Sequence, residues 1–315
     1  MAAQPRGNVA IDQEPACANL ATMLASADTD AARRERLVRG VGSILLAALL
    51  IGVMASCVRV ASRELSGPQI AFVRFFGSFL LLLLANTPGR LRPRAGNLRW
   101  LLARALFGTS SILLYYTAIQ WSGAGMATML HCTYPVSTAL IAVVFLRERL
   151  TTALVLALGL ELVGLFLVIG PGAGLSPLAV LGAACAIGAS LLAGAALTTA
   201  RHLRSSEDAW LITTYFMGIG AIVALPFWLA TPPQPSSAMW LPLAGVVLTS
   251  VASQWLVHHG LGYTSASLGS LAAATSVISA TACEALFLGE SMSPRAWLGG
   301  AAMIVAVGFA IRRSD

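Results

Sequence analysis

The segment FLRERLT, residues 145–151, returns in altered form as FLGESMS at residues 287–293. Both segments close a long apolar run, and their shared FLxE phrase pairs Glu148 with Glu290 at an offset of 142 residues. A phrase that recurs at the same point of two apolar runs indicates that one structural unit occurs twice along the chain. The predicted organisation of the chain follows from this repeat.

The composition indicates an integral membrane protein. Apolar residues make up 57% of the 315 residues and charged residues only 10%, whereas soluble domains contain about 25% charged residues. The formal net charge of +7 comes from arginines that stand at the ends of apolar runs. This placement is typical of topology signals and argues against the basic stripe of a nucleic-acid-binding protein. The cysteines lack metal-ligand spacing, so we expect no metal and no cofactor.

Ten apolar runs are long enough to cross a bilayer, because about 20 helical residues span its hydrocarbon core. We predict spans at residues 41–62, 69–86, 99–120, 124–146, 152–169, 178–200, 210–230, 240–262, 267–288 and 294–311. Residues 1–36 are polar and have no periodicity, so we predict a disordered cytosolic tail there. The sequence thus predicts an all-α membrane protein with ten transmembrane helices.

The arginines outside the spans orient the predicted helices. Fourteen of them fall on one side of the membrane and two on the other when the spans are followed in order. Because cytosolic loops carry the excess of basic residues, we predict both termini in the cytosol. A division near residue 174 gives two units of five spans, residues 37–174 and 175–315. An odd number of spans inverts the second unit, and inverted repeats are typical of secondary transporters.

Three segments also resemble a known family. GPQIAFVRFF (67–76), YYTAIQWSGAGMATMLHCTYPVSTALIAVVFLRERLT (115–151) and YTSASLGSLAAATSVISATACEALFLGES (263–291) are similar to the drug/metabolite transporter superfamily, EamA type. The resemblance covers about residues 40–311. It implies ten helices in two inverted five-helix repeats, with spans 1, 3, 4, 6, 8 and 9 around a central cavity and spans 5 and 10 more peripheral. It also implies transport of amino acids or other small metabolites. Pro135 in span 4 corresponds to Val277 in span 9, so we do not expect a symmetric pair of proline-distorted helices.

Polar side chains within the spans are the candidates for the cavity. Polar residues of span 4 recur at helical spacing on one face, and a polar face within lipid must look inward. Aromatic and histidine residues occupy equivalent points of spans 3 and 8. We assign the cavity to His131, Thr128, Thr138, Tyr115, Tyr116, Trp255, His258 and His259. Only one of the two adjacent histidines can face the cavity centre. Packed core residues, and an interfacial aromatic belt for the tyrosines, are the alternatives.

Two carboxylates lie within spans, Glu161 near the midplane of span 5 and Glu284 about one turn from the end of span 9. Intramembrane acids are costly and mark functional sites, and desolvation favours their proton-carrying form. Both are candidates for proton coupling, and we rank Glu284 first because span 9 is expected to line the cavity. The alternatives are an interfacial position for Glu284, and pairing of Glu161 with Arg104 or with a neighbouring subunit.

Three arginines, Arg59, Arg74 and Arg104, lie near span ends. Their guanidinium groups either reach the interface while the stems stay in lipid, or form an anion-attracting mouth. Glu148 and Glu290 each stand three residues before a predicted helix N-cap. We expect these two carboxylates to anchor the start of the next helix, and a gating role is the alternative.

The sequence favours a secondary transporter that moves a small organic solute, an amino acid or related metabolite, by alternating access, with export preferred over uptake. The sequence lacks a nucleotide-binding P-loop, so the energy source is a proton gradient or the gradient of the solute. An intramembrane enzyme would need paired acids or a metal cluster, and a scaffold would not need polar stripes. We expect no enzymatic activity, no nucleic-acid partner, and a monomer or homodimer in a bacterial inner membrane.

Overall fold

The computed structural model describes residues 14–85, 92–122, 124–169, 176–232, 235–288 and 294–312. Every regular element within these ranges is a helix. The first half of the chain forms α1 (Glu14–Ala61), α2 (Gly67–Leu84), α3 (Leu98–Ser122), α4 (Ala124–His131), α5 (Tyr134–Leu146) and α6 (Thr152–Ile169). The second half forms α7 (Pro177–Leu203), α8 (Ala209–Ala230), the short 3-10 helix η1 (Ser237–Met239), α9 (Trp240–Gly260), α10 (Ala266–Ala274), α11 (Ser276–Leu288) and α12 (Pro294–Arg312).

The predicted all-α membrane architecture is confirmed. Nine segments of the described chain are long and apolar enough to cross a bilayer, and Thr152–Val168 adds a shorter apolar helix. Spans 4 and 9 are each built from two helices. The tail differs from the prediction, because α1 begins at Glu14 and continues without interruption into the first span. The alanine-rich sequence of residues 14–36 favours helix over disorder. Residues 1–13 lie outside the described part.

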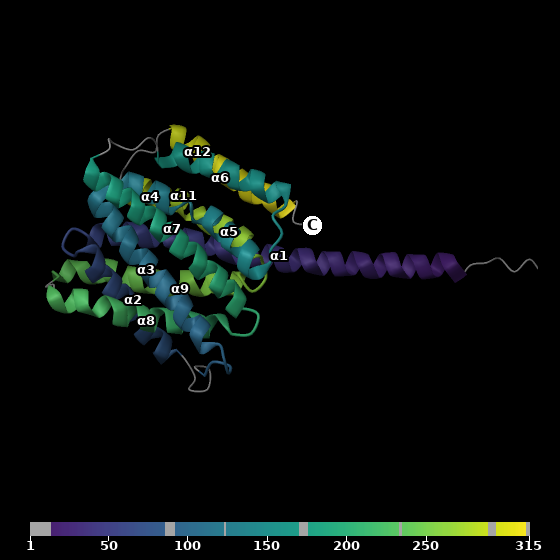
Figure 1. Ribbon diagram of the computed structural model, residues 1–315, viewed down its shortest axis with the longest axis horizontal. Coiled ribbons are helices and arrows are strands. Elements are labelled where there is room, and N and C mark those ends of the chain that lie inside the picture. Colours follow the sequence, from purple (N-terminus) through teal and green to yellow (C-terminus); the bar gives the residue numbers. More distant parts are fainter. Residues whose placement is uncertain are drawn as a thin grey trace, which may run out of the picture.

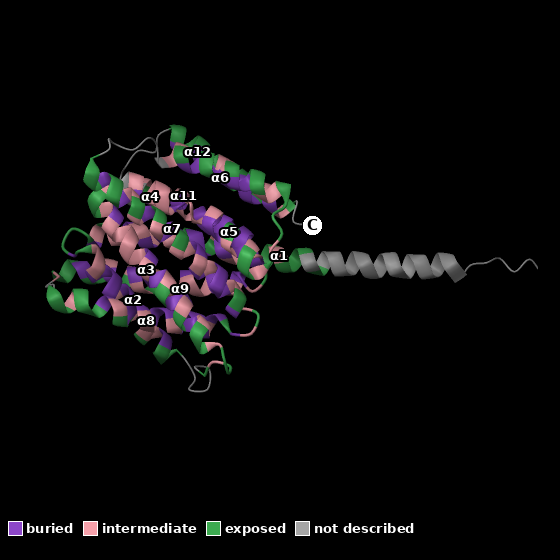
Figure 2. Ribbon diagram, in the orientation of Figure 1, coloured by how far each residue is buried: buried purple, intermediate pink, exposed green. Residues whose placement is uncertain are grey.

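The helices form a central group flanked by two peripheral pairs (Figure 1). α6 packs along α12 at one edge, and α2 packs along α8 at the other. Large apolar side chains such as Val163 and Phe166 of α6 and Ile304 of α12 are exposed, and exposed positions run along these two helices in Figure 2. Such faces are suited to lipid contact. The peripheral place of spans 5 and 10 agrees with the expectation from the family resemblance.

The packing of the helices repeats with two-fold symmetry. α3 packs on α7 as α9 packs on α1, and α5 packs on α7 as α11 packs on α1. In the α2–α8 and α6–α12 pairs, each helix packs against its own equivalent in the other repeat, so the two-fold symmetry leaves these pairs unchanged. Each of these contacts joins one helix from each half of the chain. The core therefore forms only when the two halves interleave.

Two glycines at repeat-equivalent positions set close approaches between central helices. Gly52 of α1 lies against Ser279 of α11, and Gly194 of α7 lies against Ser137 of α5. A Cβ atom added to Gly52 would stand 2.5 Å from the carbonyl carbon of Ser279, and one added to Gly194 would stand 2.9 Å from that of Ser137. Small residues at such contacts let helix backbones approach closely in membranes.

The two broken spans are interrupted at repeat-equivalent threonines. The Thr133 hydroxyl donates to the Leu130 carbonyl oxygen, and the Thr275 hydroxyl donates to the Ala272 carbonyl oxygen, each at 2.7 Å. A threonine hydroxyl that binds a carbonyl of its own helix competes with the backbone ladder and bends the helix. Spans 4 and 9 are therefore distorted at the same point of the repeat, although span 9 has Val277 where span 4 has Pro135. The shared threonine, and not proline, marks both breaks.

Replacing Gly52 or Gly194 with alanine should destabilise the bundle by about 1–3 kcal/mol, because each new methyl group would overlap the facing backbone. The measurement is the thermal unfolding temperature of the purified protein in detergent. Gly159 is the matched control, because a Cβ atom at that position on α6 meets open space. Equal unfolding temperatures for all three variants would contradict the close approach.

Candidate functional site

A cluster of polar aromatic residues surrounds the break in span 4. Tyr115 of α3 is hydrogen-bonded to Thr128 of α4 at 2.7 Å. The His131 ring lies 4.6 Å from the Tyr115 ring and 5.9 Å from the Tyr134 ring, between centroids. The Nδ1 atom of His131 is buried and has no hydrogen-bond partner. Three of the predicted cavity residues, Thr128, His131 and Tyr115, therefore stand together, and an unsatisfied ring nitrogen lies among them.

Thr138 lies apart from this cluster. Its hydroxyl donates to the Tyr134 carbonyl oxygen within α5, and its backbone faces Gly194 of α7. Tyr116 also diverges from Tyr115, because adjacent residues of a helix point about 100° apart. The Tyr116 phenol is hydrogen-bonded to the Arg74 guanidinium. The cavity role of these residues stays a prediction.

Glu161 of α6 lies beside the break in span 4. Its side chain is 1% exposed, and both of its carboxylate oxygens are buried without a hydrogen-bond partner. Cys132 and Tyr134, on either side of the break in span 4, lie within electrostatic range of it. One turn further along α6, Leu165 packs in a buried cluster that contains Cys132 from span 4 and Ala274 from span 9. The structure thus places an acid with no hydrogen-bond partner among the described residues beside the break in span 4, one turn from the cluster that joins the two broken spans.

The other acid candidate, Glu284, is on α11, and the Glu284 side chain is outside the described part of the structure. Glu161 and Arg104 are not paired among the described residues, since the guanidinium of Arg104 lies at His258 instead. The alternative reading of Glu161 as an ion-pair partner of Arg104 is therefore not supported.

Arg74 and Arg104 lie inside the bundle, and not at an interface as their snorkelling interpretation required. They are 7% and 4% exposed, whereas Arg59 is exposed near the end of α1. Arg74 donates from Nε to the Ser250 hydroxyl at 2.8 Å, and Arg104 contacts the Nε2 atom of His258 at 3.0 Å. Both arginines are near span ends in the sequence, but side chains from other helices shield them from the membrane interface.

The adjacent histidines of α9 have different surroundings. His258 is fully buried, and its Nδ1 atom lies 2.7 Å from the Thr213 hydroxyl of α8. His259 is partly exposed and stacks between Trp255 and Tyr263, with ring centroids 5.1 Å and 5.2 Å away. His258 therefore joins the arginine network, while Trp255 and His259 form a separate aromatic stack.

Glu148 binds a helix in the opposite repeat. Its carboxylate accepts hydrogen bonds from the Ala266 amide at 2.8 Å and from the Ser267 hydroxyl at 2.7 Å, at the first turn of α10. The expected anchor at the start of the next helix, α6, is replaced by this longer-range contact. Arg147, which ends α5 with a positive φ of 54°, turns the chain at this point. Glu290 lies outside the described residues.

Two further carboxylates make the same kind of contact and were missed from the sequence. Glu64, between α1 and α2, accepts the Ser236 amide at 2.8 Å, and Glu207, between α7 and α8, accepts the Arg94 amide at 2.7 Å. Ser236 and Arg94 are separated by the repeat offset of 142 residues, which was the available signal. The Ser236 contact lowers the pKa of Glu64 below its usual value. Any stabilisation from this contact is therefore present above the ordinary pKa and is lost as the pH falls through the lowered one.

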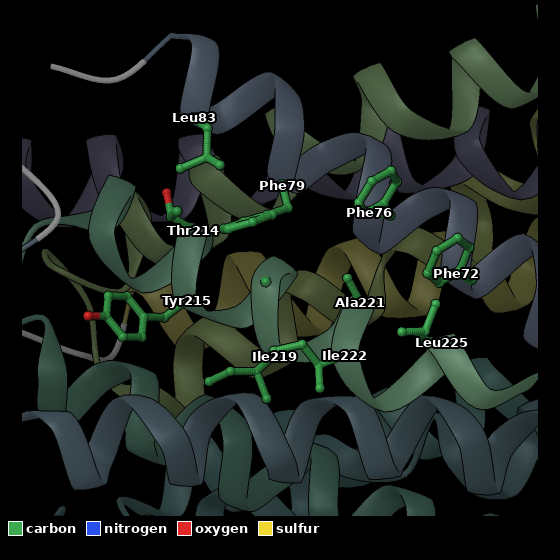
Figure 3. A pocket seen from close by; sticks show the side chains of 11 residues that line it. Phe72, Phe76, Phe79, Leu83, Thr214, Tyr215, Ile219, Ala221, Ile222 and Leu225 are labelled. Carbon is green, nitrogen blue, oxygen red and sulfur yellow. The ribbon is translucent and has the colours of Figure 1, made fainter. Parts of the chain in front are cut away.

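A cavity of about 450 Å³ lies between α2 and α8. Figure 3 shows Phe72, Phe76, Phe79 and Leu83 of α2 facing the side chains of α8 across it. Phe76 is 43% exposed, so the cavity opens on the outer surface of this helix pair. The lining carries no charged group. We assign this groove to the lipid-facing surface, and not to the solute pathway.

Comparison with known proteins gives consistent relatives. Residues 38–170 and 180–312 each match the EamA-like transporter family. An uncharacterized transporter of Archaeoglobus fulgidus is 30% identical over 85% of this chain and 94% of its own length. The pseudopaline exporter CntI of Pseudomonas aeruginosa is 26% identical over 86% of this chain and 95% of its own length. A crystal structure with 16% identity matches with a TM-score of 0.74 over 86% of this chain and 97% of that chain, which shows a shared fold.

Glu148 should hold α10 closed against the cytosol, because its carboxylate satisfies free amides at the start of that helix. Loss of a helix cap costs about 1 kcal/mol, so Glu148→Ala should raise the rate at which an impermeant reagent labels a Ser270→Cys probe in inside-out vesicles by roughly five-fold. Ser270 is fully buried in α10. The measurement uses a background without native cysteines.

Glu207→Ala is the matched control for this experiment. It removes a carboxylate–amide contact on the same predicted face, but one that leaves α10 untouched. Labelling should stay at the parent rate in this control. Equal rates for Glu148→Ala and the parent would show that Glu148 does not restrain α10.

Proposed function

The chain belongs to the EamA-like transporter family, and from that premise we propose that it exports a small organic solute from the cytosol by alternating access. The solute is an amino acid or a related metabolite, since histidine and aromatic side chains surround the break in span 4. Its family and named relatives are transporters, so we assign no enzymatic activity.

The pairing of the two broken spans is the observation that carries this proposal. The breaks occur at Thr133 and Thr275, one in each repeat, and the flanking residues Cys132 and Ala274 share one buried cluster. In transporters with inverted repeats, discontinuous helices form the solute site near the membrane midplane. Two equivalent breaks that pack together can exchange roles when access changes from one side to the other.

The direction of transport is a separate part of the proposal. The excess of arginine in alternate loops favours cytosolic termini, and a relative that covers most of the chain is named an exporter. Both features support export through a plasma membrane. Uptake of a metabolite of the same size is the alternative, because an inverted repeat can operate in either direction.

We further propose that Glu161 carries the coupling proton, ahead of Glu284. An acid that is 1% exposed and has no hydrogen-bond partner is far more stable when neutral. Because Glu161 lies beside the break in span 4, a rearrangement of this broken span would change its contact with water. A carboxyl group that alternates between dry and wet surroundings binds and releases a proton. Coupling through Glu161 does not require α6 to touch the solute.

Transport of a panel of amino acids and related metabolites in oriented vesicles tests the proposed function. We expect at least one solute to accumulate in inside-out vesicles that contain the protein when the lumen is acidified, with little accumulation in vesicles that lack the protein. Accumulation in right-side-out vesicles alone, with protons entering, would establish uptake and refute export. Absence of exchange for every solute in both orientations would count against this solute class.

Glu161→Gln should abolish proton-driven accumulation and leave solute exchange running, because the amide has a similar shape but cannot release a proton. Glu284→Gln, measured in parallel, should retain both activities. Normal proton-driven accumulation in Glu161→Gln would remove Glu161 from coupling. Loss in Glu284→Gln alone would move the proton site to α11.

A further inference from the structure

Two guanidinium groups are buried within the membrane-spanning core, and no carboxylate of the described residues pairs with either of them. Arg74 is 7% exposed and Arg104 is 4% exposed. Within the described ranges, the ion pair that the structure shows joins Arg39 and Glu35, far along the chain from both. Arg74 and Arg104 also lie within electrostatic range of each other. Charged groups inside a membrane protein are costly and mark the pathways of substrates or ions.

Besides Tyr116 of α3, which is hydrogen-bonded to Arg74, the neutral partners of these arginines lie on one face of α9. Ser250, Gln254 and His258 recur at four-residue spacing, which places them along one side of a helix over about 12 Å. Arg74 binds Ser250 at 2.8 Å, and Arg104 spans Gln254 at 3.5 Å and His258 at 3.0 Å. The two cationic groups therefore stand one above the other along a single stripe of hydrogen-bonding side chains.

His258 cannot supply the missing negative charge. The Thr213 hydroxyl donates to the Ala209 carbonyl oxygen, so it accepts from Nδ1 of His258. Nε2 is then left as the acceptor for the guanidinium of Arg104. This chain of donors and acceptors defines a neutral histidine. It orients Arg104 but leaves the charge of Arg104 uncompensated.

Arg104 retains unused donors. Its Nε and Nη1 atoms are buried and have no hydrogen-bond partner in the part of the chain that the structure describes. The Phe216 ring lies 4.3 Å from its Cζ atom, and Gly108 leaves space for its Nη1 atom. A cation–π contact offsets only part of the free energy needed to bury an ion. An anion would satisfy both the charge and the free N–H groups.

We propose that Arg74 and Arg104, with Ser250 and Gln254, form the binding site for the carboxylate of the transported solute. This inference rests on the proposed transport function and specifies its solute class as anionic or zwitterionic. Guanidinium groups bind carboxylates through strong, charge-assisted hydrogen bonds. A carboxylate held there would compensate two cations that otherwise repel each other. Arg74, Arg104 and Ser250 are buried in this structure, so solute binding at this site requires the helices around it to move.

The test compares each amino acid with its decarboxylated amine, for example histidine with histamine, tyrosine with tyramine, and succinate with succinamide for a dicarboxylate. These pairs change the carboxylate and keep the rest of the molecule. The unfolding temperature of the purified full-length protein is measured against probe concentration, because a ligand that binds the folded state raises it. We expect a concentration-dependent rise with at least one carboxylate and none with its partner. Chloride and phosphate at equal ionic strength are the controls for binding of any simple anion. An equal rise in unfolding temperature with either of them would show that the site does not select carboxylates, and would overturn the proposal.

Variants separate a binding role from a structural one. Arg104→Gln and Arg74→Gln should each abolish the carboxylate-dependent rise, whereas Arg63→Gln, at an exposed loop position, should retain it. Without a probe, Arg104→Gln should unfold at the parent temperature or above it, because an uncompensated buried charge has been removed. A lower unfolding temperature for Arg104→Gln would assign a structural role to the arginine and overturn the proposal. So would a carboxylate response that survives both substitutions.

The vesicle assay distinguishes this site from the proposed function. If carboxylate and amine partners are transported equally and Arg104→Gln changes neither, the anion site fails while the transporter stands. If carboxylates stabilise the protein through both arginines but no solute crosses the membrane in either orientation, the site stands while the transport proposal fails.

Discussion

A backbone amide in the hydrocarbon core has no water to bind, so its hydrogen-bond partner must come from the protein. This constraint governs the centre of the molecule, where two spans stop and restart at Thr133 and Thr275. The breaks are tolerated because they are enclosed by protein. Cys132 and Ala274 are buried there, and Leu165 of α6 and Met303 of α12 cover them. The peripheral α6–α12 pair thus has a specific task, which is to keep lipid away from interrupted backbone.

Carboxylates at the ends of the helices bind further backbone amides. Glu64, Glu207 and Glu148 each accept a backbone amide from the opposite repeat. The partner residues are Ser236, Arg94 and Ala266, which have nothing in common as side chains. A contact made to the main chain does not depend on the partner's identity. The two repeats can therefore diverge in sequence and still keep the links that hold them together.

The sequence predicted the all-α membrane architecture because hydropathy reports directly on the bilayer. It did not predict the break in span 9, because proline is a visible marker of a distorted helix and a threonine that binds its own helix is not. The acid at Glu161 was recognised from its depth, but its place beside the break in span 4 depends on packing between α6 and residues near Cys132. Arg104 was assigned to an interface because linear position cannot show which neighbours cover a side chain.

The partner of Glu148 could not be predicted from the residues next to it in the sequence either. A carboxylate three residues before a helix start suggests a contact with that helix, whereas the positive φ of Arg147 directs the chain towards α10. The repeat offset contained usable information that single positions did not. It pairs Thr133 with Thr275, Gly52 with Gly194, and Arg94 with Ser236, and in each case both members make equivalent contacts.

The glycine contacts have a mechanical consequence. Gly52 brings α1 into backbone contact with α11, and Gly194 brings α7 into backbone contact with α5. Helices seated this closely slide or tilt as one body, because separating them would open a gap that no side chain can fill. Each of these bodies combines helices from both halves of the chain. In the proposed transport cycle, the rigid units are therefore not the two sequence repeats, because each unit contains helices from both repeats. The hinge between these units does not coincide with the boundary between the repeats.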